Sequence, residues 1–166
     1  MEHPTTTALA EQSHIAYTDG ACHGNPGPGA WAHFTLNPDG TFTEAAGFLR
    51  GTTNQRSELL AAINALEETR ADARVHIYSD SAYVVNGATQ WLDGWKQKNW
   101  LTAKKKSVKN RDLWERLDAL MATRGVSFEH IPGHSGIPGN ERADALAQQA
   151  TAERVNFGPI TFQFEQ

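Results

Sequence analysis

The fold is decided by residues 15–29, which read Ile15-Ala16-Tyr17-Thr18-Asp19-Gly20-Ala21-Cys22-His23-Gly24-Asn25-Pro26-Gly27-Pro28-Gly29. The first part alternates between the two faces of a strand, and Asp19 shares the parity of the apolar Ile15 and Tyr17. A carboxylate in line with core-facing side chains must be paired, hydrated or bound to a metal, because a bare buried charge is strongly unfavourable. The same pattern is compatible with a turn-forming aspartate at a strand end, so both interpretations stay open at this point.

Length and composition bound the class of protein. The chain has 166 residues, of which 39% are hydrophobic and 20% charged, and this fits one soluble globular domain. The single cysteine, Cys22, excludes an internal disulfide and is typical of a reducing compartment. No apolar run approaches the roughly 18 residues of a membrane span. Residues 1–13 hold no Lys or Arg, so we expect a flexible extension there, no signal peptide, and a cytoplasmic protein.

Positive charge is concentrated in one segment, although the formal net charge is −4. No acidic residue lies between Asp93 and Asp112. Tryptophans interleave with the lysines there, which indicates either a nucleic-acid surface or a small core that supports a protruding helix; we favour the first. All six lysines fall in this segment: Lys96, Lys98, Lys104, Lys105, Lys106 and Lys109.

Periodicity predicts alternating strands and helices. Three consecutive strands suggest an antiparallel meander, and the strand–helix–strand order that follows implies parallel pairing. The segment 90–98 could be helical. We expect strands at 14–20, 29–37, 41–49, 74–79 and 126–131, helices at about 54–70, 81–87, 110–124 and 140–152, and a tail without clear pattern at 153–166.

Four further residues are candidates for chemistry, each with a plainer alternative. Glu58 borders the apolar stripe of the first helix, where a solvated, dipole-favoured glutamate is also common. Asp80 ends a strand and is either a site residue or the N-cap of the next helix. His134 lies in a glycine-rich loop and is either a solvated residue or a proton shuttle. Asp144 lies beside the small-residue face of the last helix.

The chain closely resembles ribonuclease H type I over about residues 14–152. The resemblance implies an α/β ribonuclease H-like fold, with a five-stranded mixed sheet of order 3-2-1-4-5 flanked by helices, and a basic protrusion at 90–109. It rests on five motifs in the family's order: Thr18-Asp19-Gly20-Ala21-Cys22 with Gly24-Asn25-Pro26-Gly27-Pro28-Gly29; Thr52-Thr53-Asn54-Gln55-Arg56-Ser57-Glu58; Ser79-Asp80-Ser81; Gly133-His134; and Asn140-Glu141-Arg142-Ala143-Asp144.

The same resemblance implies hydrolysis of the RNA strand of RNA–DNA hybrids with Mg²⁺, for which Mn²⁺ can substitute. Asp19, Glu58, Asp80 and Asp144 would be both catalytic and metal-binding, and His134 would assist proton transfer or product release. Clustered carboxylates repel one another, and a hard divalent cation relieves that repulsion. In this hypothesis Asp19 bridges two ions, Glu58 and Asp80 hold one of them, and Asp144 holds the other.

Substrate contacts are also carried over from the family. Cys22, Asn25, Asn54 and Gln55 would sense the RNA 2′-hydroxyls, several of them through their backbone. Thr53 and Asn110 would hold a DNA phosphate, although Gly51 stands where many members carry an arginine that Arg50 could replace. The remaining hybrid-binding candidates, along the groove and on the basic protrusion, are Trp91, Trp95, Lys96, Lys98, Trp100, Lys104, Lys105 and Lys106.

Two rival functions remain distinguishable by experiment. An integrase, transposase or junction resolvase of the same fold would cut duplex DNA, and a module that binds hybrids without catalysis would lack activity. The Asn/Gln set that would face the 2′-hydroxyls disfavours the first, and the four carboxylates disfavour the second. We also expect a monomer without an obligate protein partner, because no unexplained apolar stripe is evident.

Overall fold

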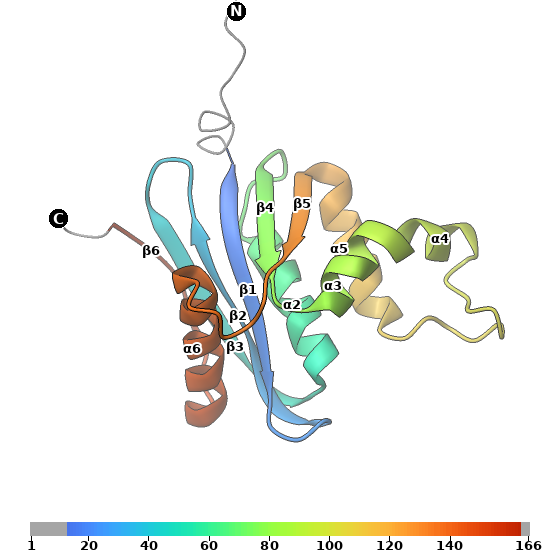
Figure 1. Cartoon of the computed structure of the whole chain (residues 1–166), viewed down its shortest axis with the longest axis horizontal. Helices are drawn as coiled ribbons and strands as arrows, with labels where there is room; N and C mark the ends of the chain where they lie inside the picture. Colours follow the sequence, from blue (N-terminus) through green and yellow to red (C-terminus); the bar gives the residue numbers. More distant parts are fainter. Residues whose placement is uncertain (1–12, 164–166) are drawn as a thin grey trace, which may run out of the picture.

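The computed structural model describes residues 13–163, and the extension predicted at 1–13 lies almost wholly outside them. A mixed sheet separates two helical layers (Figure 1). In chain order the elements are β1 (His14–Cys22), β2 (Gly27–Leu36), β3 (Phe42–Thr52), α2 (Asn54–Glu67), β4 (Arg74–Ser79), α3 (Ala82–Asn86), the π-helix η1 (Gly87–Trp91), α4 (Leu92–Gln97), α5 (Arg111–Thr123), β5 (Gly125–His130), α6 (Pro138–Glu153) and β6 (Phe157–Phe162).

The sheet has the order β5-β4-β1-β2-β3-β6. The pairs β1–β2 and β2–β3 are antiparallel, and the pairs β1–β4 and β4–β5 are parallel. The predicted order 3-2-1-4-5 is therefore confirmed for the first five strands. The predicted count is one too small, because Phe157–Phe162, assigned to a tail, pairs antiparallel with β3 as a sixth strand.

The two faces of the sheet carry cores of different character. On one face, large side chains of α2, α3 and α5 pack against β1 and β4, with Trp114 fully buried. Gly87 permits this packing, because a Cβ there would lie 2.1 Å from the Trp114 indole. On the other face α6 packs on β1–β3 mainly through alanines and the buried Leu146, and Phe157 packs against this cluster.

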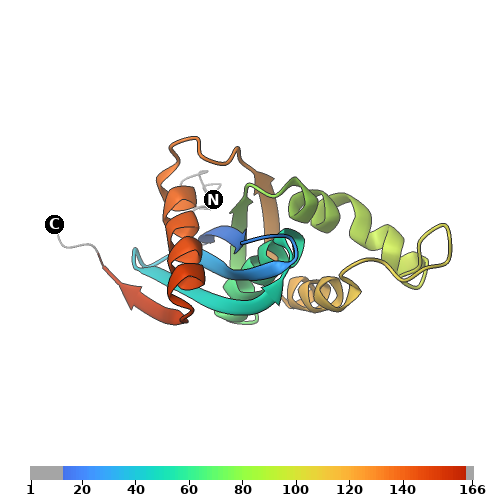
Figure 2. The same cartoon turned by 90° about the horizontal axis from the view of Figure 1, so that it is seen from below.

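The helices α3, η1 and α4 project beyond β5 and lead into a loop that returns to α5 (Figures 1 and 2). This arm contains the basic protrusion predicted at 90–109. An isolated bridge between Leu101 and Ser107 closes the loop at its tip. Within residues 13–163, no helix combines the length and apolar character needed to cross a membrane.

Candidate active site

Asp19 lies near the carboxyl end of β1, in the middle of the sheet. Only 4% of its surface is exposed. It is paired across the β1–β2 ladder with Ala32, and the Gly20 amide donates a hydrogen bond of 2.9 Å to its Oδ1. Asp19 is therefore buried, as expected, but Ile15 and Tyr17 of the same parity are only half-buried, and Ala16 and Thr18 on the other face of the strand are fully buried.

Glu58 reaches Asp19 because α2 packs tightly over β1. The helix begins at the N-cap Thr53, whose hydroxyl accepts a hydrogen bond of 3.2 Å from the Arg56 amide. A Cβ at Gly20 would lie only 2.6 Å from the Glu58 nitrogen, so glycine is required at this crossing. Glu58 Oε2 is buried and has no hydrogen-bond partner among the described residues, so the plain interpretation of a solvated glutamate is wrong.

Asp80 joins the pair because β1 and β4 are parallel neighbours whose carboxyl ends meet, with Thr18 beside Ser79. It follows β4 directly and does not cap α3. Ser81 is the N-cap there, and its hydroxyl accepts a hydrogen bond of 3.2 Å from the Val84 amide. One carboxylate oxygen each from Asp19, Glu58 and Asp80 lie within 4.8 Å of one another.

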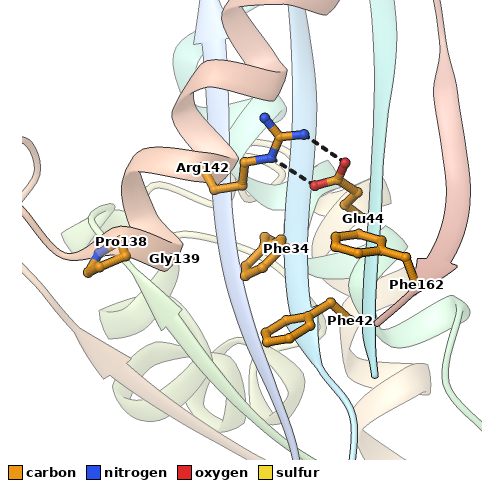
Figure 3. Close-up of a pocket in the computed structure, with 7 residues that line it drawn as sticks. All are labelled: Phe34, Phe42, Glu44, Pro138, Gly139, Arg142 and Phe162. Atoms are coloured by element: carbon orange, nitrogen blue, oxygen red, sulfur yellow. Dashed lines mark hydrogen bonds and ion pairs between the residues drawn. The ribbon is translucent and has the colours of Figure 1, made fainter. Parts of the chain in front are cut away.

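Asp144 comes from α6, which covers the face of the sheet opposite to α2. Two contacts hold that helix in place. Gly139 packs on Tyr17, where a Cβ would lie 2.3 Å from the ring. Arg142 forms a two-pronged ion pair with Glu44 of β3, at 2.8 and 2.7 Å, above a pocket whose floor contains Phe34, Phe42 and Phe162 (Figure 3). Sequence reasoning missed this anchor, because the strand partner lies 98 residues away.

Mutual repulsion and burial change the acidity of the cluster. Burial, followed by the negative charge of Asp80, raises the pKa of Asp19 to about 8, and the charge of Asp144 contributes in the same direction. Burial and the charges of Asp19 and Asp80 raise the pKa of Glu58 well above its usual range. Several buried carboxylates without a balancing positive charge form a site that suits a hard divalent cation such as Mg²⁺. The donor set therefore fits a metal, and the unpartnered Glu58 oxygen is the structural sign of it.

His134 lies in the loop between β5 and α6, exposed and with a left-handed backbone (φ 54°). The neighbouring Gly133 faces Asp80, since a Cβ there would lie 2.9 Å from Asp80 Oδ2. The loop thus brings the imidazole into the neighbourhood of the cluster, although no hydrogen bond joins His134 to another described residue.

The residues predicted to sense the 2′-hydroxyl gather where the β1–β2 loop meets the start of α2. Asn25 Oδ1 accepts a hydrogen bond of 3.1 Å from the Asn54 amide. Cys22 Sγ lies 3.5 Å from the Thr52 carbonyl oxygen. Loop and helix therefore present one continuous surface next to Asp19, with Asn25 and Asn54 both exposed.

A polar cluster continues this surface at the start of α5. Asn110 has a left-handed backbone (φ 60°) and donates hydrogen bonds to Gln55 Oε1 at 3.5 Å and to the Tyr83 hydroxyl at 3.1 Å. Its Oδ1 accepts a bond of 3.3 Å from Arg56, which also pairs with Asp112 at 2.7 Å. Sequence reasoning did not predict roles for Tyr83 and Arg56; both fix the amide of Asn110.

The tryptophans of the basic protrusion divide between the two predicted environments, a small supporting core and an exposed surface. Trp95 and Trp100 pack against the core, and the rings of Trp95 and Trp114 lie 5.2 Å apart. Trp91 is 39% exposed. Lys96 pairs with Asp118 at 3.2 Å. The remaining lysines of the protrusion are exposed: Lys98, Lys104, Lys105, Lys106 and Lys109.

Fold and site together define a class of protein. Carboxylates from three separate elements meet at the centre of a mixed sheet, beside an arm bearing exposed lysines, and such oxygen clusters are typical of nucleases that use divalent metals.

Comparison with known proteins narrows this class. The family model for RNase H matches residues 11–152. Ribonuclease H of Dinoroseobacter shibae is 52% identical over 142 residues, covering 83% of this chain and 90% of the relative. LC9-RNase H1, a type 1 RNase H with the type 2 active-site motif, superposes with a TM-score of 0.80 at 26% identity, over 92% of this chain and 78% of that one. LC11-RNase H1 in complex with an RNA/DNA hybrid gives a TM-score of 0.64 at 25% identity, over 86% and 99%. The chain belongs to the ribonuclease H family, the metal-dependent endonucleases that hydrolyse the RNA strand of RNA–DNA hybrids.

Proposed function

We propose that Asp19, Glu58, Asp80 and Asp144 are the catalytic, metal-binding residues of this ribonuclease H, and that Mg²⁺ is the metal, with Mn²⁺ able to substitute. The observation that carries the proposal is the trio of carboxylate oxygens within 4.8 Å, which includes a buried Glu58 oxygen without a partner. Bound divalent ions would supply an activated water and stabilise the leaving 3′ oxygen, so that the products carry 5′-phosphate and 3′-hydroxyl ends.

Within this proposal Asp19 has the central role, because it is the residue whose acidity responds to each of the other three carboxylates. It would bridge two ions, with Glu58 and Asp80 on one ion and Asp144 on the other. Asp144 stands apart from the close trio, and the helix that carries it is held by the Arg142–Glu44 pair. His134, in its exposed loop, would assist proton transfer or product release.

Recognition of the hybrid would use two neighbouring surfaces. Cys22, Asn25, Asn54 and Gln55 would contact the RNA strand through its 2′-hydroxyls, in the wide minor groove of the duplex. The support is the hydrogen bond that joins Asn25 to the first residue of α2, and the position of this surface beside Asp19. LC11-RNase H1, a neighbour in fold, has been seen with an RNA/DNA hybrid.

The DNA strand would lie toward the arm. Thr53 and Asn110 would hold a phosphate, with Arg56 hydrogen-bonded to Asn110, and Trp91 would follow the groove. The basic protrusion would attract the hybrid through its lysines, while Trp95 and Trp100 act mainly as its scaffold. We expect a cytoplasmic monomer, as the sequence predicts.

The deciding experiment is cleavage of an end-labelled RNA–DNA hybrid with Mg²⁺, comparing wild type with Asp80→Asn. Asp72→Asn, at an exposed site in an ion pair with Arg70, is the matched control for loss of one carboxylate. We expect wild type and control to cut only the RNA strand and Asp80→Asn to lose at least roughly 100-fold in rate, the scale of a lost metal ligand.

Other results would contradict the proposal. Cleavage of duplex DNA at a similar rate would indicate a DNA nuclease of the same fold. Hybrid that is bound by the wild type but left intact would indicate a binding module. Full activity of Asp80→Asn would remove this carboxylate from the metal site.

A further inference from the structure

A hollow of about 530 Å³ lies at the end of the β1–β2 loop, away from the carboxylate cluster. Its lining residues are Pro28, Phe48, Arg50 and Arg154, which we call the cationic hollow. They come from β2, β3 and the end of α6, so the hollow joins three elements. None of the lining residues is acidic.

The two arginines of the cationic hollow carry positive charge that the protein leaves unneutralised. Neither Arg50 nor Arg154 forms an ion pair within residues 13–163, and the side chain of the adjacent Glu153 is engaged by Gln149. The Arg154 guanidinium carbon lies 6.0 Å from the centre of the Phe48 ring, a cation–π contact that orients this side chain without cancelling its charge. In a protein with a net charge of −4, such a paired concentration of cations indicates an anionic partner.

The backbone explains why Arg50 lines this hollow. The β2–β3 register slips by one residue between the pairs Gly29–Leu49 and Gly27–Thr52, which leaves two β3 residues opposite Pro28. A bulge of this kind re-aims side chains. Arg50 forms no hydrogen bond with Asn110 or any other described residue. The expectation that Arg50 replaces the arginine missing at position 51 stays a prediction; in this structure Arg50 lines the cationic hollow.

We propose that the cationic hollow binds a backbone phosphate of the hybrid, beyond the nucleotides that meet Asn25. This inference rests on the proposed function. Its support is continuity: Pro28, at the start of β2, lies three residues after Asn25, and Arg50 lies two residues before Thr52, whose carbonyl meets Cys22. Guanidinium groups suit phosphate because their donors match its oxygens in pairs. The contact lengthens the footprint of the enzyme on its substrate and takes no part in the chemistry.

The test is the affinity of the Asp80→Asn protein for hybrid, with and without Arg50→Gln and Arg154→Gln. Glutamine keeps much of the side-chain length, and thermal unfolding checks that substitution at Arg154, whose backbone is left-handed, leaves the stability of the fold unchanged. Arg70→Gln with Arg74→Gln removes the same charge, at two exposed positions, and is the matched control.

For a long hybrid we expect the double variant to bind about tenfold more weakly, with the slope of log affinity against log salt reduced by about one to two. Lysine at both positions should restore the salt slope, because the charge returns, but only part of the affinity, because an ammonium group cannot pair two donors with the phosphate. A hybrid that spans only the carboxylate cluster and the β1–β2 loop should bind the variant and its parent equally.

Outcomes for the two proposals are separable. If wild-type enzyme cuts hybrid but the double variant matches the control in affinity and salt slope, the cationic hollow is not a hybrid contact and the proposed function stands. If affinity falls equally for short and long hybrids, the effect is general electrostatics and the inference is wrong. If wild type neither binds nor cuts hybrid, the proposed function itself fails.

Discussion

At the scale of single residues, Asp19 sets the properties of the site. It is buried, and its carboxylate lies next to those of Glu58 and Asp80. In the folded protein these three carboxylates therefore repel one another in the candidate active site. Binding of a divalent ion releases that repulsion, which links metal affinity, pH and stability.

The first prediction concerns the pH dependence of stability without metal. The pKa of Asp19 is about 8 in the folded chain and near 3.8 when unfolded. Between these values only the folded state holds the proton, so the free energy of unfolding should fall as pH rises from about 4 to 8. Asp19→Asn should remove this contribution and stabilise the metal-free protein at pH 8 by about 2 kcal/mol or more.

Urea unfolding in EDTA at several pH values measures this effect. The difference between wild type and Asp19→Asn should grow with pH, and Mg²⁺ should stabilise the wild type but hardly the variant. Asp72→Asn serves as the surface control. A difference that stays constant from about pH 4 to 8 would falsify the assignment of a raised pKa to Asp19.

A second prediction concerns Gly20, where α2 crosses β1. A Cβ there would lie 2.6 and 2.8 Å from the Glu58 nitrogen and the Ser57 Cβ, so Gly20→Ala must push the helix away. We expect a loss of about 1–3 kcal/mol in stability and a larger loss of kcat, since Glu58 moves with the helix. Gly94→Ala, which meets nothing within 4 Å, is the stability control. Wild-type stability and activity in Gly20→Ala would show that the crossing can relax freely.

At the scale of elements, α6 carries Asp144 to a site whose Glu58 is supplied by α2, on the other face of the sheet. Its alanines allow close packing, but alanine contacts alone leave the helix free to slide. Arg142 lies two residues before Asp144, and its ion pair with Glu44 fixes the position of the helix on β3 (Figure 3).

The third prediction tests this anchor. Glu44→Gln should reduce stability only slightly, by about 0.5–1 kcal/mol, because the arginine is half exposed. It should lower kcat several-fold with little change in KM, and raise the Mg²⁺ concentration needed for half-maximal activity. Glu67→Gln, which breaks the exposed pair with Arg116, is matched in chemistry and lies on α2. Equal kcat in the two variants would leave the anchor with a purely structural role.

The elements also show what sequence can predict here. The meander, the parallel crossover and the carboxylate on β1 follow from local periodicity and were predicted correctly. The strand Phe157–Phe162 was missed, because Gly158 and Pro159 interrupt its alternation and its pairing with β3 is a long-range contact. The meeting of Glu58 and Asp80 with Asp19 was expected from the family resemblance. Spacing alone was equally compatible with a solvated Glu58 and with Asp80 as the N-cap of the next helix.

At the scale of the whole molecule, charge is segregated. The arm formed by α3, η1, α4 and the following loop projects from the body of the protein (Figure 2). It carries exposed lysines, whereas the body has a net negative charge. A polyanion approaching the protein is attracted to the arm and repelled by the body, which orients it before it docks. The cationic hollow, at the end of α6, would be a second and weaker point of attraction.

The fourth prediction follows from this segregation. Replacing Lys104, Lys105 and Lys106 with glutamine should raise KM for hybrid at low salt and leave kcat nearly unchanged, because these residues lie in an exposed turn away from the carboxylates. The slope of log(kcat/KM) against log salt should fall by up to about three, one for each phosphate that the variant no longer neutralises. A matched triple replacement of the exposed Arg70, Arg74 and Arg116, outside the arm, should change the slope much less, since net charge alone acts weakly once salt screens it. Should both triple variants show the same reduced slope, attraction would depend on total charge, and the arm would have no special part in capturing the hybrid.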